Sequence, residues 1–183
     1  LPFVVLLAVV GLVRLGELIW SAQNLRRRGC RPLAEPWLFP AMVAQHSAVI
    51  VLPPFEVLGL GRPFVPQLAA AAGGVLALGV ALRIWTLWTL GRAWSVRVAT
   101  PEPGSVATTG PYRFIRHPNY LAVILEVGAL PLIHEAWISC LVLSALNVAL
   151  LARRIRTEEA LLSCVPAWTA AMSDRARLVP GLY

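Results

Sequence analysis

Long apolar runs, separated by short polar stretches, fill most of the chain. A helix needs about 20 apolar residues to cross the hydrocarbon core of a bilayer. Three runs near this length come first, and a longer fourth run is divided by Pro131 and by the polar pair His134-Glu135. We interpret the fourth run as two helices in a tight hairpin, so the pattern predicts about five membrane-spanning helices. Their expected bounds are about 2–20, 37–52, 67–90, 119–133 and 136–153.

The predicted fourth helix is short for a full crossing, and we expect it to tilt or to be shielded by its neighbours. The alternative arrangement has four spanning helices and one re-entrant segment. The first run lacks an Ala-x-Ala cleavage pattern, so we expect a spanning helix there and no signal peptide. The expected fold class is an all-α integral membrane protein with a C-terminal helical hairpin, and residues 1–183 are expected to form one membrane-embedded domain.

The tail over residues 154–183 differs from the rest of the chain, because charged and apolar residues alternate there at helical spacing. Leu161, Leu162, Trp168 and Met172 form a possible apolar face. We therefore expect a cytoplasmic amphipathic helix, broken near Pro166, that lies against the bundle or the bilayer surface.

Composition supports the membrane interpretation. Apolar residues make up 58% of the 183 residues and charged residues only 14%, and the mean hydropathy is +0.71. A soluble domain has about 45–50% apolar and about 25% charged residues, so the few charges here could hardly cover a soluble globule. Such abundant apolar surface also excludes a disordered chain. The three cysteines form no CxxC pair and the three histidines are scattered, so we predict no metal site.

The basic residues predict an orientation. All 16 are arginines, and the formal charge is +7. With five crossings, 13 of the 16 fall on one side, in two loops and the tail, whereas Arg62 alone falls on the other. Cytoplasmic loops of membrane proteins are enriched in this way, so both basic loops and the C-terminus are expected in the cytoplasm. Because the arginines separate apolar runs, we expect membrane lipids and no nucleic acid as partners.

Two polar clusters carry the candidate chemistry. The loop over about 91–118 ends in the run Gly110-Pro-Tyr-Arg-Phe-Ile-Arg-His-Pro-Asn-Tyr120, which gathers donors, aromatic rings and an imidazole where the chain enters the membrane. The second cluster contains Arg154 and Glu158, which share a helix face because they are four residues apart. Taken alone, the first is equally consistent with an arginine-rich interfacial anchor, and the second with a solvated helix end.

Together, the Gly-x-Tyr-x-x-x-Arg-His-Pro-x-Tyr run, the hairpin and the later Arg-x-x-x-Glu-Glu resemble the isoprenylcysteine carboxyl methyltransferase family of integral membrane enzymes that use S-adenosylmethionine. The resemblance covers about residues 75 to 183. Arg14, Glu17 and Asn24 before a basic loop, with His46 after it, also resemble a bacterial branch often associated with type III polyketide synthases. Members of that branch methylate hydroxyls of alkylresorcinols or alkylpyrones.

The resemblance implies a cofactor site and a place for the acceptor. S-Adenosylmethionine has positive amino and sulfonium groups that favour carboxylates and aromatic faces. Arg154 is implied at the group that is methylated, and Glu158 at the cofactor. The residues implied at the cofactor are Gly104, Ser105, Val106, Ala107, Tyr112, His117, Pro118, Asn119, Tyr120, Glu158 and Glu159.

The implied function is methyl transfer from S-adenosylmethionine to an oxygen, carboxylate or phenolic, of a lipophilic substrate that enters from the bilayer. A phenol needs either a cation such as Arg154 or a base, and we consider Glu126, Glu158 and His46 for the base. The predicted catalytic residues are Arg154, Glu158 and Glu126. The alternatives are a methyltransferase or reductase of the phospholipid or sterol type, and a non-catalytic lipid-binding membrane protein.

Other polar and aromatic residues have structural interpretations. Charges within apolar helices usually face the bundle interior, and we expect Arg14 and Glu17, three residues apart, to pair within the first helix. Trp85, Trp88 and Trp94 are predicted to anchor the membrane interface.

Overall fold

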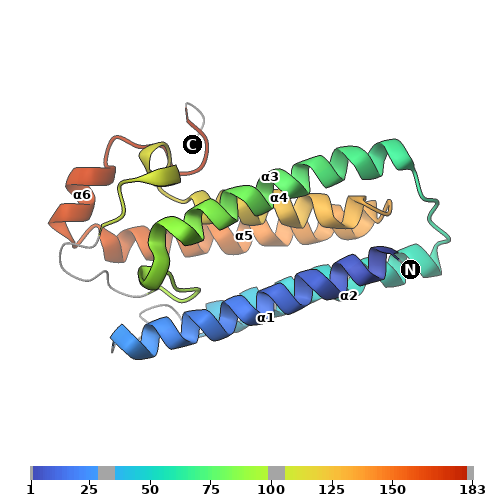
Figure 1. The fold of residues 1–183 in the computed structure, drawn as a ribbon, viewed down its shortest axis with the longest axis horizontal. Helices are drawn as coiled ribbons and strands as arrows, with labels where there is room; N and C mark the ends of the chain where they lie inside the picture. The colour runs from blue at the N-terminus through green and yellow to red at the C-terminus, as the bar shows by residue number, and fades with distance from the viewer. Residues whose placement is uncertain (1, 29–35, 99–105, 181–183) are drawn as a thin grey trace.

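The computed structural model describes residues 2–28, 36–98 and 106–180. All regular secondary-structure elements in these residues are helices, apart from one isolated β-bridge between Ile115 and Ala176. Five helices run alternately in opposite directions along an elongated bundle, and three short helices lie near one of its ends (Figure 1). The long helices are α1 Pro2–Arg28, α2 Leu38–Gly59, α3 Pro66–Leu90, α4 Pro118–Leu132 and α5 Trp137–Leu162. The short ones are the 3-10 helices η1 Gly91–Ala93 and η2 Gly110–Arg113, and the α-helix α6 Pro166–Met172.

Four of the helices in the described residues are long and apolar enough to cross a membrane: α1, α2, α3 with η1, and α5. Helix α4 has 15 residues, which at 1.5 Å per residue is about 22 Å and short of the roughly 30 Å hydrocarbon core. The predicted all-α integral membrane fold is confirmed. The fourth helix is short, as predicted, and the chain turns after it at residues 133–136 to form the hairpin.

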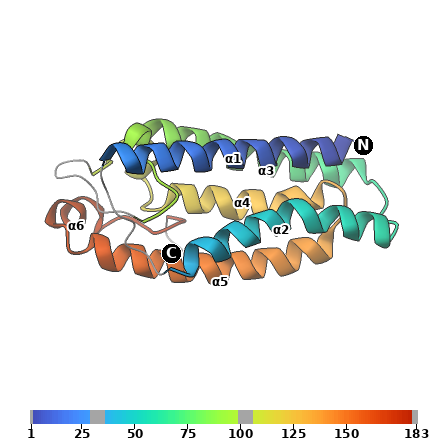
Figure 2. The same cartoon turned by 90° about the horizontal axis from the view of Figure 1, so that it is seen from below.

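Helix α4 is the most enclosed of the five and packs against α3, α5 and α2 (Figure 2). Nine of its residues are buried, whereas α1, with 27 residues, has five. Gly79 permits the close approach of α3, because a Cβ atom there would lie 3.0 Å from Glu126 Cγ and 3.2 Å from the Ala122 carbonyl oxygen. A small residue at such a contact is typical of membrane helix pairs. The short α4 is thus shielded by its neighbours.

Three helices extend beyond the bounds that the sequence pattern predicts. Helix α1 continues to Arg28, and α2 continues through Pro53 and Pro54 to Gly59. The two prolines lack the N–H groups that would bond to the preceding turn, but such gaps are tolerated inside membrane bundles. Helix α5 continues to Leu162, so Arg154, Glu158 and Glu159 stand on its last turns and not on a separate tail helix. The predicted break near Pro166 is present, and α6 begins at that residue.

The basic segments meet at one end of the bundle, which we call the polar end. Helices α1, α3 and α5 finish there, and α2 and α4 begin there (Figure 1). Arg62 lies at the opposite end, where its guanidinium contacts Glu56 at 3.2 Å and the Trp137 ring at 4.9 Å.

The three tryptophans of the α3 region do not behave alike. Trp88 and Trp85 are 85% and 47% exposed, as expected of interfacial side chains. Trp94 is 3% exposed and stacks on Trp20 with ring centroids 5.1 Å apart, so its predicted anchoring role is wrong. It instead packs the loop after α3 against α1.

Candidate functional site

A cavity of about 510 Å³ lies within the bundle and reaches the polar end. This volume falls within the range of small-molecule sites, about 300–1,000 Å³. Its walls include a polar part near the loops and an apolar part between α1 and α2, and the lining also contains Arg14, Glu17, His46 and Arg83. The polar part includes Tyr112, Arg116, His117, Asn119, Tyr120, Arg154 and Glu158, and the apolar part includes Gly11, Leu15, Leu18, Val43, Ile50 and Val51.

The apolar part of the cavity extends to the outer surface of the bundle. Leu15 of α1 and Val51 of α2 both line the cavity, yet they are 57% and 50% exposed. In a membrane, the outer surface of these helices faces lipid. The cavity therefore joins an apolar wall that reaches the outer surface of the bundle to a polar wall near the loops.

Three side chains on α4 and α5 form what we call the edge cluster: Tyr120, Arg154 and Glu158. Tyr120 is buried in α4, and its hydroxyl donates a hydrogen bond to a Glu158 carboxylate oxygen. Arg154 Nε donates to the same hydroxyl at 2.7 Å, and a second guanidinium nitrogen donates to the Val96 carbonyl. The remaining one, Nη1, contacts the Met42 thioether sulfur at 3.6 Å, which is a weak acceptor.

Glu158 differs from the other carboxylates near the cavity. Within residues 2–28, 36–98 and 106–180 it forms no ion pair, and its hydrogen bond comes from the neutral Tyr120 hydroxyl. Tyr112 lies on the same wall, and burial together with the charge of Glu158 raises the pKa of its phenol. The Tyr112 hydroxyl therefore stays protonated at neutral pH. A carboxylate beside two aromatic rings is a suitable environment for a cationic ligand group.

Glu159, one residue further on, is held by two arginines and a histidine. Its carboxylate accepts hydrogen bonds from Arg116 at 3.3 Å, His117 at 3.2 Å and Arg177 at 2.9 Å. The His117 ring in turn stacks on Tyr120, with centroids 5.2 Å apart and the planes at 22°. Glu159 thus holds the imidazole beside the edge cluster, although it does not line the cavity itself.

The segment after α6 is fastened to the residues that precede α4. The backbone N–H groups of Arg116 and His117 donate to the carbonyls of Ala176 and Arg177 at 2.9 and 3.0 Å. Arg116 also donates from its guanidinium to two carbonyls of this segment, each at 2.7 Å. Its side chain is therefore engaged in tying down the C-terminal segment.

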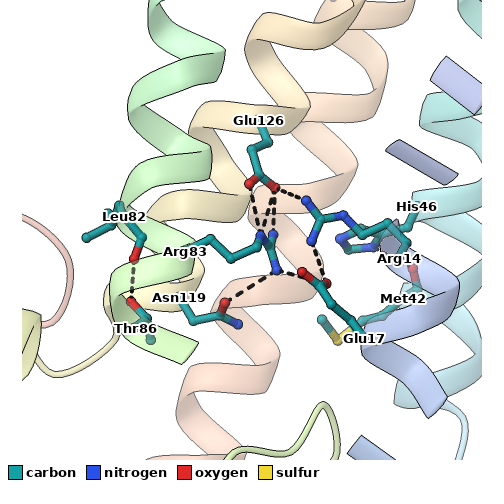
Figure 3. Close-up of polar contacts among 9 residues, drawn as sticks. All are labelled: Arg14, Glu17, Met42, His46, Leu82, Arg83, Thr86, Asn119 and Glu126. Carbon is teal, nitrogen blue, oxygen red and sulfur yellow. Dashed lines mark hydrogen bonds and ion pairs between the residues drawn. The ribbon is translucent and has the colours of Figure 1, made fainter. Parts of the chain in front are cut away.

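A second polar group lies deeper, between the helices, and we call it the ion-pair quartet: Arg14, Glu17, Arg83 and Glu126 (Figure 3). Arg83 donates to both Glu126 oxygens, from Nε at 2.9 Å and from Nη2 at 2.6 Å. Arg14 donates to Glu126 at 2.8 Å and to Glu17 at 2.5 Å, which confirms the predicted pair within α1. Arg83 also lies 3.5 Å from Glu17. Two cations and two anions thus balance, and they join α1, α3 and α4.

His46 of α2 lies beside this quartet and lines the cavity (Figure 3). Its Nδ1 is 2.8 Å from the Met42 carbonyl oxygen, one helical turn back. Met42 is also the residue whose sulfur contacts Arg154. The imidazole therefore lies about one turn of α2 further from the polar end than Met42, which contacts Arg154 of the edge cluster.

The structure brings most of the residues implied by the resemblance onto one cavity wall. Those that line the cavity are Val106, Ala107, Tyr112, His117, Asn119, Tyr120, Arg154 and Glu158. Pro118 begins α4 next to the cavity, Glu159 lies behind His117, and Glu126 is held in the quartet. Gly104 and Ser105 lie outside the described residues.

Met42, Val96 and Trp168 are among the lining residues that sequence reasoning missed. Met42 lies within an apolar run and gives no chemical signal, and Val96 contributes a backbone carbonyl, which no sequence pattern distinguishes. Trp168 was assigned only to an apolar tail face, but it lines the cavity, and the Arg116 guanidinium lies 5.9 Å from its ring centroid.

The fold and the cavity define a helical membrane protein with a small-molecule site at one end of its bundle. The chain belongs to the isoprenylcysteine carboxyl methyltransferase (ICMT) family, whose sequence profile matches residues 72–164. It is also similar to "Uncharacterized protein YpbQ" of Bacillus subtilis (strain 168), with 28% identity over 160 residues, or 86% of this chain and 94% of that protein. Family membership supports a membrane methyltransferase that uses S-adenosylmethionine.

Proposed function

We propose that the chain binds S-adenosylmethionine in the polar part of the cavity and methylates an oxygen of a lipophilic acceptor that enters from the bilayer. The observation that carries this proposal is that Glu158 has no ion-pair partner among the described residues. It is the carboxylate on the polar wall whose charge no described cation pairs, whereas Glu17 and Glu159 are each held by arginines.

The residues of the polar wall suit the cofactor. Glu158 would accept hydrogen bonds from a cationic amino group, and the rings of Tyr112 and Tyr120 would contact a sulfonium or an adenine. Asn119 would supply a donor for a carboxylate through its amide NH2 group. When bound, the cofactor supplies an electrophilic methyl group. The chain contributes alignment and the exclusion of water, which account for much of the acceleration in such transfers.

Arg154 is the residue that we assign to the acceptor oxygen. Two of its nitrogens are committed to the Tyr120 hydroxyl and the Val96 carbonyl, which fix the plane of the guanidinium. Nη1 has only a thioether partner in the described residues, so an oxygen would be a better acceptor there. A guanidinium is protonated at every relevant pH and stabilises an anionic oxygen.

The apolar part of the cavity determines the class of acceptor. A substrate chain lying between Leu15 and Val51 would remain in contact with lipid while its polar head reached Arg154. This arrangement fits a long-chain amphiphile, and the alkylresorcinols and alkylpyrones methylated in the bacterial branch that the chain resembles are of this kind.

The orientation is part of the proposal, because the cofactor must reach the polar end. The arginine-rich loops meet at that end, which favours placing it in the cytoplasm. A reporter fused after Tyr183 should therefore behave as cytoplasmic. A periplasmic signal would overturn both the orientation and the expected route of the cofactor.

The proposed function can be tested with purified protein in lipid nanodiscs, methyl-labelled S-adenosylmethionine and a bacterial lipid extract. We expect label in a lipophilic product whose new methyl group is attached to oxygen, as mass spectrometry would determine. Glu158→Gln should slow the transfer strongly at low cofactor concentration, while the same substitution at Glu135, in the hairpin at the far end, should leave it intact. Label on a phospholipid amine would replace the proposed acceptor, and no cofactor binding by the unmodified chain would refute the proposal.

A further inference from the structure

We infer that His46 accepts the proton of an acceptor hydroxyl during methyl transfer. This inference rests on the proposed methyl transfer and adds a proton acceptor to it. It depends on three observations: the hydrogen bond of the His46 ring, the position of His46 along α2, and the ion pairs that already hold the carboxylates around the cavity.

The hydrogen bond of His46 determines which ring nitrogen carries the proton. Nδ1 lies 2.8 Å from the Met42 carbonyl oxygen. A carbonyl oxygen can only accept, so Nδ1 is the donor. In a neutral imidazole the other nitrogen, Nε2, then carries a lone pair. His46 is one of the residues that line the cavity, and we assign Nε2 to the ligand.

The position along α2 places this nitrogen near the expected acceptor oxygen. Met42 precedes His46 by one helical turn, an axial rise of about 6 Å. The Met42 sulfur contacts Arg154 Nη1, the group that we assign to the acceptor oxygen. Arg154 and His46 line the same cavity, so a hydroxyl that lies between them would face both side chains.

The carboxylates near the cavity are less suited to take this proton. Glu126 accepts hydrogen bonds from both Arg83 and Arg14, and Glu17 lies between the same two arginines. Glu158 already accepts a hydrogen bond from Tyr120 and is assigned to the cofactor. A carboxylate held by guanidinium groups is a poor base, because protonation would break the ion pairs.

The charges that surround His46 come from three other helices. Arg14 and Glu17 face it from α1, Arg83 from α3 and Glu126 from α4 (Figure 3). Their charges balance within the quartet, so the imidazole borders a polar group of no net charge. A neutral base between such a group and an apolar cavity matches an uncharged hydroxyl better than a carboxylate, which is already ionised.

The transfer step balances as follows. The acceptor oxygen forms the new O–CH3 bond, and the S–CH3 bond of the methyl donor breaks with its electron pair going to sulfur. The hydroxyl proton moves to His46 Nε2, and it leaves to solvent after the products separate. A phenol with a pKa of about 10 needs this proton acceptor at neutral pH, whereas an ionised acceptor does not.

The kinetic test compares two acceptors of the same chain length. One is a simple alkylphenol. The other carries nitro groups, which lower the pKa of its hydroxyl enough for it to be ionised at the assay pH. His46→Asn keeps an amide N–H for the Met42 carbonyl but has no basic nitrogen. We expect turnover of the simple alkylphenol to fall by about 100-fold or more, with the ionised alkylphenol and cofactor affinity nearly unchanged.

A second readout does not depend on turnover. The chain has three histidines, so the imidazole nitrogens of ¹⁵N-histidine-labelled protein can be assigned by comparison with His46→Asn. Nε2 of His46 should give the signal of an unprotonated nitrogen and should shift when the alkylphenol is added. The methyl ether of the same compound has no proton to donate and should leave the signal in place.

The outcomes separate this inference from the function on which it rests. If the unmodified chain methylates only carboxylate amphiphiles, or His46→Asn impairs both phenols equally, the role of His46 is refuted while methyl transfer stands. A proton on Nε2 in the labelled protein would also refute it. If the unmodified chain neither binds the cofactor nor methylates either phenol, the proposed function itself fails.

Discussion

The ion-pair quartet and the edge cluster are both built from arginine and glutamate within an apolar bundle, yet they differ in how their charges are matched. In the quartet, two arginines face two glutamates, and each carboxylate lies within 3.5 Å of two guanidinium groups. In the edge cluster, Arg154 and Glu158 do not pair directly; both bond to the Tyr120 hydroxyl that lies between them.

This difference indicates different roles. Charges within a membrane are costly unless they are paired, so the closed quartet is a device that joins α1, α3 and α4. A cation and an anion held apart by a neutral hydroxyl retain their capacity to bind ligands of opposite charge. Polar groups in a membrane bundle are therefore better judged by how their charges are matched than by their presence alone.

The largest effect is expected when the quartet is opened. Arg83→Leu removes three hydrogen bonds from Glu126 and leaves this buried carboxylate to Arg14 alone. Loss of one partner of a buried pair costs about 3–5 kcal/mol, so the midpoint of denaturation in detergent should fall markedly. The double variant Arg83→Leu/Glu126→Leu should recover much of the loss. A double variant less stable than either single one would contradict a mainly pairwise role.

A smaller effect, on binding and not on folding, is expected at Glu158. Glu158→Gln removes the charge that no described cation pairs, so affinity for S-adenosylmethionine should fall by roughly 10–100-fold, as for loss of a charge-assisted hydrogen bond. The matched variant Glu17→Gln should show the opposite pattern, with lower stability and nearly unchanged affinity. Calorimetry and thermal unfolding of the two proteins would check this, and equal behaviour would remove the distinction between the clusters.

Arg154→Lys should lower turnover by about tenfold. Lysine retains the charge but not the planar fork that reaches the Val96 carbonyl, the Tyr120 hydroxyl and the acceptor together. Cofactor affinity should stay close to that of the unmodified chain. Steady-state kinetics beside calorimetry would measure both quantities, and full turnover in the lysine variant would exclude the assigned role.

The smallest effect is expected at Glu159, which shares features of both clusters. Like the quartet it is paired, but its partner Arg177 is 40% exposed, and an exposed ion pair contributes about 0.2–1 kcal/mol. Glu159→Gln would loosen His117 and should weaken cofactor affinity only about 2–5-fold, with little change in the unfolding midpoint. A loss as large as that of Glu158→Gln would mean that Glu159 contacts the ligand directly.

The sequence pattern predicted the helices and the pair Arg14–Glu17 because both follow from local spacing. It failed at Pro53 and Pro54, since the neighbours that stabilise a helix across two prolines are not visible locally. The Arg83–Glu126 pair joins residues 43 positions apart, and it depends on the register of α3 against α4 at Gly79. The contact of Met42 with Arg154 depends in the same way on how α2 and α5 meet.

The segment after α6, which contains Ala176 and Arg177, is synthesised after the five long helices, so it can reach its place only after they are made. The helices emerge from the ribosome one after another, and α1 to α5 can enter the membrane before this segment is made. His117 gains its backbone partner, and Glu159 the Arg177 guanidinium, only after the later segment folds back. Membrane insertion can thus precede the step that fixes His117 and Glu159 beside the edge cluster.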